Sequence, residues 1–431
     1  MKLLILGGSN IQVNTIKKAK SIGIETIVSD YNNINKGKKI SDFSECVSTF
    51  DIESTLDVAK KYNIDGILTV GTDQPVYTVA KIQESLKLPF LINAKTALAV
   101  TNKKIMKKRF MDNNLSSNKY IIINKNFKAN ELKDIKFPVV MKPLDSQGQR
   151  GIFKLNSIEE IRENIDKTLS FSRSDEVIIE EYYLSDEITV SGWVKDSKTH
   201  LLTITDRLKF ETNKHIGICY GHNFKSKYFD DYYLEIEEFS KNIVNVFNIE
   251  NGPIYFQFLV GNEGLKINEI ACRIGGAYED ILIPKVTNVD ILEMLINYSL
   301  GLKVDYTALE NYDITKIYEY SSVQLFFTKP GKIVDKTNLS EIKEIYDGGY
   351  NIIENQEVKM IEDASARAGY FITFAKNRKD LDMKINSIFK QIKILNEKGD
   401  NLIITYQQFN DSVEDWRSKW KKLCWFYACL C

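Results

Sequence analysis

The sequence predicts a fold that begins as α/β and continues as α+β, and three observations support this. Residues 1–95 alternate short apolar stretches with amphipathic ones, a repeat typical of a doubly wound, Rossmann-like parallel sheet. Between about residues 101 and 302, apolar strands are separated by longer polar segments and a few helical stretches. Between about residues 305 and 407, short strands alternate with one helix. The expected domains are 1–95, 96–304 (subdomains about 96–178 and 179–304) and 305–408.

The composition is that of a folded, multidomain protein. The chain has 431 residues, 43% of them hydrophobic, and 58 Lys and Arg balance 58 Asp and Glu. A zero net charge argues against a nucleic-acid partner, because binding to phosphates usually needs a basic surplus. No apolar run reaches the roughly 20 residues of a membrane span, so no transmembrane segment is expected. Six cysteines in so long a chain form no disulfide framework, which predicts the reducing cytoplasm.

The first strand ends in a glycine turn. Gly7-Gly8-Ser9 follows the apolar run at residues 3–6, and Asp30 ends the second predicted strand. Dinucleotide-binding folds place a glycine turn and an acid at such positions. The third glycine of their fingerprint is missing here, however, which disfavours a nicotinamide cofactor. The alternatives are that the turn caps a helix or that it contacts a substrate.

A lysine and a glycine-containing loop form the first candidate site. Lys142 ends the predicted strand PVVMKP, and the loop SQGQRG follows at residues 146–151. A lysine provides a point charge for a triphosphate, and loop amides can close over its oxygens. The alternative is an ordinary β-turn.

Two further strands, PIYFQFLV and GLKINEIA, are joined by the turn at residues 261–264 and predict a β-hairpin. Normal register places Gln257 opposite Glu269, so both can point to one side. Oxygen ligands on adjacent strands suit Mg²⁺ or Mn²⁺. Arg273, beside Gly275-Gly276, can hold a carboxylate or a developing phosphoryl charge. Two acids, Glu180-Glu181, lie at the end of another predicted strand and are further candidates for the site. The alternative is that they are solvated surface charges.

These features, taken in order along the chain, resemble the ATP-grasp superfamily. The resemblance covers about residues 1–404 and rests on Lys103, Lys142, the glycine loop, the acid pair and the stretches FQFL and INEIACRIGG. It implies a Rossmann-like domain, an ATP-grasp domain of two α+β subdomains that grip ATP, and a C-terminal α+β domain. It also implies that a carboxylate is activated as an acyl phosphate and then joined to an amine.

The resemblance implies a role for each matching residue. Lys103, Lys142 and the mobile loop would hold the ATP phosphates, with Lys142 and Arg273 as catalytic residues. Gln257 and Glu269 would bind the metal, although Gln257 stands where relatives usually have an acid. The implied nucleotide-binding residues are Lys103, Lys142, Ser146, Gln147, Gly148, Arg150, Gly151, Glu180, Glu181, Tyr182 and Glu187.

Two local similarities point to different reactions. The stretch NEIA resembles the carboxyaminoimidazole ribonucleotide synthases, whereas the ending RIGG and the block at residues 362–394 are closer to L-amino-acid ligases. We expect a carboxylate–amine ligase acting on small molecules. The alternatives are a ribonucleotide-type carboxylating synthase and an ATP- or metabolite-binding protein with little or no catalysis. Residues expected at the substrate are His215, His222, Arg273, Gly275, Gly276 and Arg367. The alternative for Arg367 is a surface ion pair with Asp363, and the alternative for the two histidines is that they are incidental residues of a loop.

The last residues differ from the rest. Three of the four tryptophans and three of the six cysteines lie in the stretch 409–431. Apolar residues there recur at helical spacing, which predicts a short amphipathic helix. Such a helix could dock onto a partner or a membrane surface. The alternative is that it packs on the rest of the chain. Related enzymes are often dimers, so a homodimer is also expected.

Overall fold

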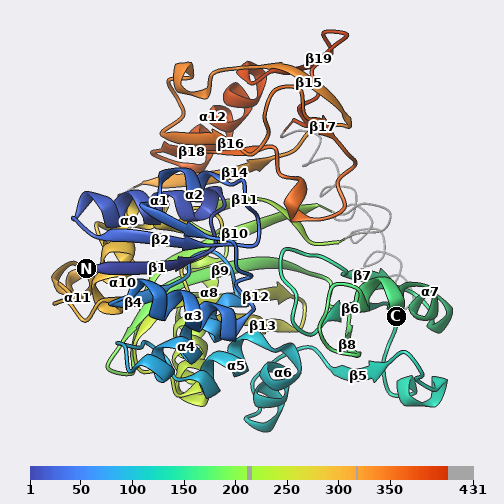
Figure 1. Ribbon diagram of the computed structural model, residues 1–431. Coiled ribbons are helices and arrows are strands. Elements are labelled where there is room, and N and C mark those ends of the chain that lie inside the picture. Colours follow the sequence, from blue (N-terminus) through green and yellow to red (C-terminus); the bar gives the residue numbers. More distant parts are fainter. Residues whose placement is uncertain (211–215, 317–318, 406–431) are drawn as a thin grey trace. The chain divides into compact units, whose positions relative to one another are not determined.

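The computed structural model describes residues 1–210, 216–316 and 319–405 (Figure 1). The predicted tail helix and His215 lie outside these residues. The chain divides into two compact units. The first contains Met1–Gln147, Leu155–Asp206 and Lys225–Ile317, and the second contains the described residues of Gly148–Lys154, Arg207–Phe224 and Tyr318–Cys431. The predicted domain boundaries near residues 95, 304 and 408 stay predictions.

The predicted N-terminal parallel sheet is confirmed. Its strands run in the order β3-β2-β1-β4, all parallel, with β1 at Lys2–Leu6, β2 at Glu25–Ser29, β3 at Phe43–Glu45 and β4 at Gly66–Leu68. Alternate residues of β1 face opposite sides. Leu3 and Ile5 pack in the cluster that contains α1, and Leu4 and Leu6 pack in the cluster that contains α3 and α4. Helices therefore cover both faces (Figure 1).

Most helices of the first unit bury one face, and most begin at a side-chain cap. Asn93 and Asn102, for example, accept hydrogen bonds from backbone amides three residues on. The helices are α1 Asn10–Ser21, α2 Lys36–Ile40, α3 Ile52–Tyr62, α4 Pro75–Leu86, α5 Ala94–Thr101, α6 Lys103–Asp112, α7 Ile158–Leu169, α8 Phe229–Phe247, α9 Glu279–Thr287, α10 Ile291–Ser299 and α11 Thr307–Asn311, with a 3₁₀ turn at Ala129–Leu132.

Two antiparallel sheets follow in the first unit. In the smaller one, β8 (Glu176–Glu181) pairs with β5 (Tyr120–Asn124) on one side and β6 (Val139–Pro143) on the other. In the larger one, the order is β13-β12-β9-β10, with bounds Gly264–Ala271, Gly252–Gly261, Ser185–Lys195 and Lys198–Phe210. The apolar faces of α5, α6 and α8 pack against this sheet in one core. A short strand, β7, covers Phe153–Leu155.

The second unit has its own core, around Phe326, Phe327 and Phe371. Its main sheet has the order β11-β14-β18-β16, and α12 packs on β18 (Figure 1). A small sheet has the order β17-β15-β19. The bounds are β11 Ile218–Phe224, β14 Tyr320–Phe326, β15 Gly331–Lys336, β16 Asp347–Tyr350, β17 Glu357–Val358, β18 Gly369–Ala375, α12 Arg378–Gln391 and β19 Ile394–Asn396, with 3₁₀ turns at Leu339–Glu341 and Ala364–Ala366.

One prediction of local structure is wrong. The many polar residues at 211–228 predict a loop from the sequence, but the described part of this segment contains a strand, β11, whose seven residues are all buried. Because both faces of β11 are covered, its polar residues, such as His222 and Asn223, do not alternate with apolar ones. The period-2 signal of a half-exposed strand is therefore missing from this segment.

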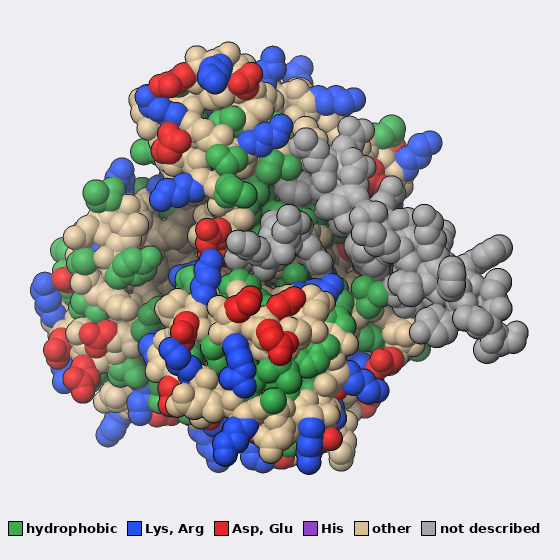
Figure 2. Space-filling model, turned by 90° about the vertical axis from the view of Figure 1, so that its right-hand side faces the viewer, with side chains coloured by type: hydrophobic (Ala, Val, Ile, Leu, Met, Phe, Trp, Pro, Cys, Tyr) green, Lys and Arg blue, Asp and Glu red, His purple; other side chains and the backbone are tan. Residues whose placement is uncertain are grey.

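The charged side chains are mixed on the face shown in Figure 2, where basic and acidic groups alternate over the surface. This agrees with the balanced count of charges. Within the described residues, no helix combines the length and the apolar character that a membrane crossing requires.

Candidate functional site

Helix α6 supplies two lysines to one place in the first unit. Asn102 caps the helix by accepting a hydrogen bond from the Ile105 amide at 3.2 Å, which fixes where the helix starts. Lys103 and Lys107 are then one turn apart on the same face. Both are buried, and the side chain of Lys107 is only 1% exposed.

Glu180 lies between two of the buried lysines. Its Oε2 atom is 3.1 Å from Nζ of Lys142 and 3.3 Å from Nζ of Lys107. The strands β6 and β8 bring Lys142 and Glu180 together, because Val140 pairs with Glu180 and Lys142 with Ile178. The other oxygen of Glu180, Oε1, is buried and accepts no hydrogen bond. An unsatisfied buried acceptor is costly unless a ligand supplies a donor.

Burial and charge compete in this cluster. Burial raises the pKa of Glu180, but the charges of Lys107 and Lys142 outweigh it, so the pKa of the Glu180 carboxyl is lowered. Burial lowers the pKa of Lys142, but Glu180 and Glu269 outweigh it and the net shift is upward. For Lys107, burial wins and the pKa is lowered. Lys142 is therefore a firmly charged ammonium, whereas Lys107 loses its proton more readily than Lys142 does.

The predicted hairpin is confirmed, with Gln257 directly opposite Glu269. One feature was not predicted: Phe258 pairs with Ile267, so Asn268 is an extra residue in β13. Such a β-bulge re-aims neighbouring side chains. Asn268 Oδ1 accepts a hydrogen bond from Lys142 at 3.3 Å, and Glu269 Oε1 lies 3.4 Å from Nζ of Lys103. Two consecutive residues of one strand thus contact two different lysines.

The face of the sheet that carries Glu269 continues as a polar row. Gln257 pairs with Thr189 on β9, and Thr189 pairs with Thr205 on β10. The two threonine hydroxyls are 2.6 Å apart. Residues directly paired across strands point to the same side of a sheet. The row gives this side of the site several oxygen atoms.

Glu269 is expected to make stability depend on pH. Burial raises the pKa of Glu269, but Lys103, Lys142 and Lys107 outweigh it and hold the pKa at about 2, against 4.5 for the ordinary group. A lowered folded-state pKa contributes stability that is present above the unfolded value and is lost as pH falls toward about 2. The Glu269→Gln variant should therefore be less stable than wild type at pH 7, and the difference should shrink between pH 5 and 2. Urea unfolding across this pH range measures the free energy of unfolding of both proteins. If both proteins lost the same stability as the pH falls, the expected link between ionisation of Glu269 and stability would be wrong.

Arg273 forms an ion pair with Asp73, a residue from the N-terminal part of the chain. Its Nε donates to Oδ1 of Asp73 at 2.8 Å, and the terminal NH2 nitrogen is 2.6 Å from the same oxygen. The guanidinium carbon lies 4.5 Å from the ring centroid of Tyr255. Burial lowers the pKa of Arg273, but Asp73 outweighs it, so the pKa is raised. Tyr255 therefore fixes one face of the Arg273 guanidinium, and Asp73 fixes one edge, before any substrate is present.

The Gly276 backbone passes close to Gly71, in the loop that carries Asp73. A Cβ atom at Gly276 would lie 2.7 Å from the Gly71 carbonyl oxygen, and the Gly71 amide donates to Ile274 O at 3.1 Å. Gly276→Ala should force these segments apart, cost about 2 kcal/mol of unfolding free energy and lower the activity through Arg273. Thermal unfolding together with turnover tests this. An unchanged melting temperature would show that the two segments move apart without a loss of stability.

The start of the glycine loop contacts the same groups. The Ser146 carbonyl accepts a hydrogen bond from Lys103 Nζ at 3.1 Å, and Gln147 Oε1 accepts one from the Asp73 amide at 2.7 Å. Gly148 and Gly151 have φ angles of 69° and 70°. Such positive φ values favour glycine, which explains two residues of the loop.

The structure brings most of the predicted first-unit residues together. One cavity is lined by Lys103, Gln257, Glu269 and Arg273 together with Asp73 and Tyr255. Three further residues of the site, Asp73, Lys107 and Asn268, were not predicted. Glu187 is buried, and its charge contributes to the raised pKa of Lys142.

The remaining predicted residues are more peripheral. Glu181 accepts a hydrogen bond from the Lys136 amide at 3.0 Å, and the Tyr182 amide donates to Pro138 O at 2.9 Å. The Tyr182 amide is thus paired within the protein, and the role of Tyr182 in nucleotide binding stays a prediction. Gly275 lies against the carboxylate of Glu279. The predicted residues Gly148, Arg150, Gly151, His222 and Arg367 belong to the second unit, and their roles stay predictions.

The structure defines the class of the protein as a mixed α/β protein with a buried lysine–carboxylate cluster, an arrangement that suits a polyanionic ligand. Residues 135–279, which contain Lys142, Glu180 and Glu269, match the ATP-grasp domain family. The match spans 145 of the 431 residues and agrees with the resemblance to the ATP-grasp superfamily that the sequence shows.

Similar proteins include ligases and synthases. The phosphoribosylamine–glycine ligase of Methanococcus vannielii is 25% identical over 334 residues, which cover 70% of this chain and 73% of that protein. The carbamoyl-phosphate synthase of Methanobrevibacter smithii is 26% identical over 196 residues, which cover 44% of this chain and 51% of that protein. The chain thus spans about half the length of that relative. The L-amino acid ligase structure from Bacillus licheniformis has a TM-score of 0.79 at 14% identity, over 92% of this chain and 98% of that one. This last likeness concerns the fold.

Proposed function

We propose that the chain is an ADP-forming carboxylate–amine ligase, with amino acids as the substrate class. The observation that supports this most is that Arg273 lines the same cavity as Lys103 and Glu269. A planar guanidinium is suited to hold a carboxylate, and buried lysines are suited to hold a phosphate chain. A cavity that combines the two can bring a carboxylate oxygen to a terminal phosphate.

The first step transfers the γ-phosphoryl group of ATP to a carboxylate oxygen, which gives ADP and an acyl phosphate. Lys103 and Lys142 offset the negative charge of the phosphate oxygens. Arg273 orients the carboxylate, and Asp73 keeps the fork in place through the 2.6 Å and 2.8 Å contacts. Catalysis is then mainly positioning and electrostatic stabilisation.

In the second step the amine nitrogen attacks the acyl carbon and phosphate leaves. The nitrogen loses a proton and an amide bond forms. Exclusion of water matters here, because water would hydrolyse the acyl phosphate. Burial of Lys142, Glu180 and Arg273 is consistent with a site that is dry once substrates are bound.

The residues present fit a magnesium ion shared with ATP. Among the described residues, no group of three or more His, Cys, Asp or Glu side chains could hold a metal alone. Glu269 is ionised well below neutral pH and faces the amide of Gln257. One carboxylate and one amide oxygen, with substrate phosphates as the other ligands, match the way Mg²⁺ usually binds. When bound there, the ion would neutralise phosphate charge next to Lys103.

A carboxylating synthase is the second candidate, and Asn268 favours it. The stretch NEIA, similar to that of ribonucleotide synthases, includes Asn268, which contacts Lys142. ATP binding with little catalysis is the third, because the neutral Gln257 replaces a charged metal ligand. For the protein as a whole we also propose a cytoplasmic location and a homodimer.

The test measures ADP release with ATP and Mg²⁺ against single amino acids, pairs of amino acids, and bicarbonate with a separate amine panel. Mass spectrometry of the products identifies any amide. Turnover that requires amino acids and yields an amide supports the ligase. Bicarbonate-dependent turnover without an amide supports the carboxylating synthase, and nucleotide binding without turnover under any condition supports the third candidate.

A further inference from the structure

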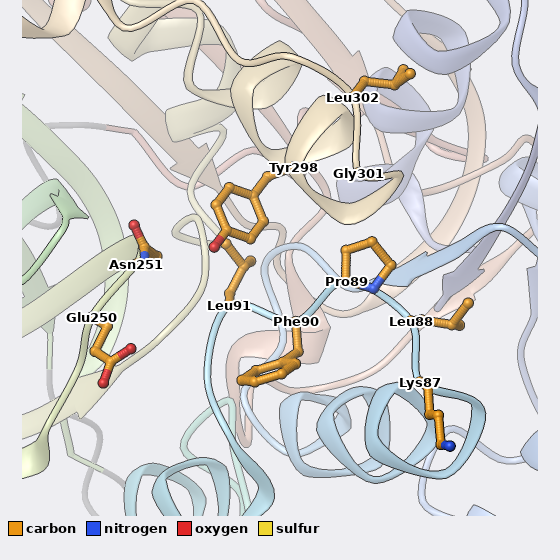
Figure 3. Close-up of a pocket in the computed structure, with 10 residues that line it drawn as sticks. All are labelled: Lys87, Leu88, Pro89, Phe90, Leu91, Glu250, Asn251, Tyr298, Gly301 and Leu302. Atoms are coloured by element: carbon orange, nitrogen blue, oxygen red, sulfur yellow. The ribbon is translucent and has the colours of Figure 1, made fainter.

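A pocket of about 530 Å³ lies in the first unit, and no residue of it lines the cavity of the candidate site (Figure 3). Ligand pockets commonly measure about 300–1,000 Å³, so the volume suits a small molecule. Three segments form it: the loop after α4, the start of β12 and the end of α10. The lining residues are Lys87, Leu88, Pro89, Phe90, Leu91, Glu250, Asn251, Tyr298, Gly301 and Leu302.

The pocket presents an apolar surface that the fold does not cover. Phe90 is 52% exposed and Leu302 is 40% exposed, and Pro89 and Leu91 lie between them in the lining (Figure 3). Large apolar side chains gathered in a pocket mark a binding surface more often than scattered ones do. The flat ring of Phe90 offers a face against which an aromatic or branched group can pack.

One end of the pocket is acidic. The Tyr298 phenol points to the side where Glu250 and Asn251 lie (Figure 3). Burial and then the charges of Asp196 and Glu250 raise the pKa of Tyr298. Glu250 forms no ion pair with any residue that the structure describes. Lys87 lies at the end away from Glu250 (Figure 3).

We propose that this pocket binds a small organic cation, a primary ammonium on an aromatic or branched apolar body. The ammonium would donate to Glu250 and to the Tyr298 hydroxyl oxygen, and the body would pack on Phe90 and Leu302. An ammonium has three donors and no acceptor, which matches an end built from the Glu250 carboxylate, the Asn251 amide and the Tyr298 phenol. The proposal does not depend on the proposed ligase reaction.

The position gives such a ligand a route to influence the candidate site. Leu91 lines the pocket and also lines a buried cavity of about 30 Å³. Arg273 lines that cavity and the cavity of the candidate site. A ligand packed on Leu91 is therefore separated from Arg273 by one small cavity.

The test titrates the full chain, without nucleotide, with phenethylamine, L-phenylalanine and the neutral 2-phenylethanol, using calorimetry. Phenethylamine or L-phenylalanine should bind clearly more tightly than 2-phenylethanol. The tighter-binding of the two ammonium compounds, the cationic amine or the zwitterionic amino acid, identifies the source of the ammonium. Equal binding of 2-phenylethanol would overturn the proposal, because the acidic end would then contribute nothing.

Variants with matched controls locate the binding. Glu250→Gln should weaken cation binding about threefold or more, and Phe90→Ser about tenfold. Glu235→Gln, at an exposed position, and Phe50→Ser, at a half-exposed one, should leave it unchanged. Unchanged affinity in both pocket variants would overturn the proposal. Loss of binding in Lys142→Met would also overturn it, because the cation would then occupy the candidate site.

Discussion

Replacing Lys142 with methionine is expected to reduce ADP formation at least about a hundredfold, the loss typical of removing one preorganised donor to a developing charge. Lys142 is buried, its ammonium is held by Glu180 and Asn268, and its pKa is raised. It therefore presents a fixed full charge. Methionine keeps the length and apolar character of the stem, so the loss should be in catalysis and not in folding.

The measurement is steady-state release of ADP, with circular dichroism as the check on folding. Lys104→Met is the control, because Lys104 lies beside Lys103 on helix α6 but is half-exposed and pairs with Glu176. The control should retain activity within about twofold, as expected of an exposed ion pair. Wild-type activity in Lys142→Met would remove this lysine from the catalytic site.

Replacing Glu180 with glutamine is expected to destabilise the protein by about 3 kcal/mol, because removing one partner of a buried ion pair leaves a charge uncompensated. Lys107 is 1% exposed and would lose its carboxylate. Lys107→Met alone should cost less, since Glu180 keeps its contact with Lys142 at 3.1 Å. The double variant should recover most of the stability lost in Glu180→Gln.

Chemical denaturation of the four proteins at pH 7 and pH 9 tests this. In Glu180→Gln the pKa of Lys107 should fall further, so the unfolded state binds more protons than the folded state and stability rises with pH. The deficit should therefore be smaller at pH 9. Glu181→Gln, at the half-buried neighbour, is the control and should change stability by less than about 0.5 kcal/mol. Additive losses in the double variant would exclude coupling between Lys107 and Glu180.

Features encoded by local periodicity could be predicted from the sequence. The first parallel sheet follows from alternating apolar and amphipathic segments, and the hairpin follows from two strands and a short turn. Both are confirmed. The pairing of Gln257 with Glu269 also needs the bulge at Asn268, because an unbroken register from the turn would pair Gln257 with Asn268. The buried strand β11 could not be found in this way, because its polar residues are covered on both faces.

The missed parts of the candidate site depend on contacts between distant segments. Helix α6 contains four lysines, and nothing in the sequence distinguishes the buried Lys107 from the exposed Lys108. Asn268 contacts Lys142 only because a bulge adds one residue to β13. A bulge changes which side a residue faces without changing the composition of the strand.

The pair between Asp73 and Arg273 joins positions that are 200 residues apart in the chain. Ends of so long a segment meet late and slowly in folding, because closing a long loop costs entropy before the contact is made. During synthesis, the N-terminal sheet can form well before Arg273 has left the ribosome. Substrate binding should accordingly be among the last properties to return during refolding, after the signals of secondary structure are already complete.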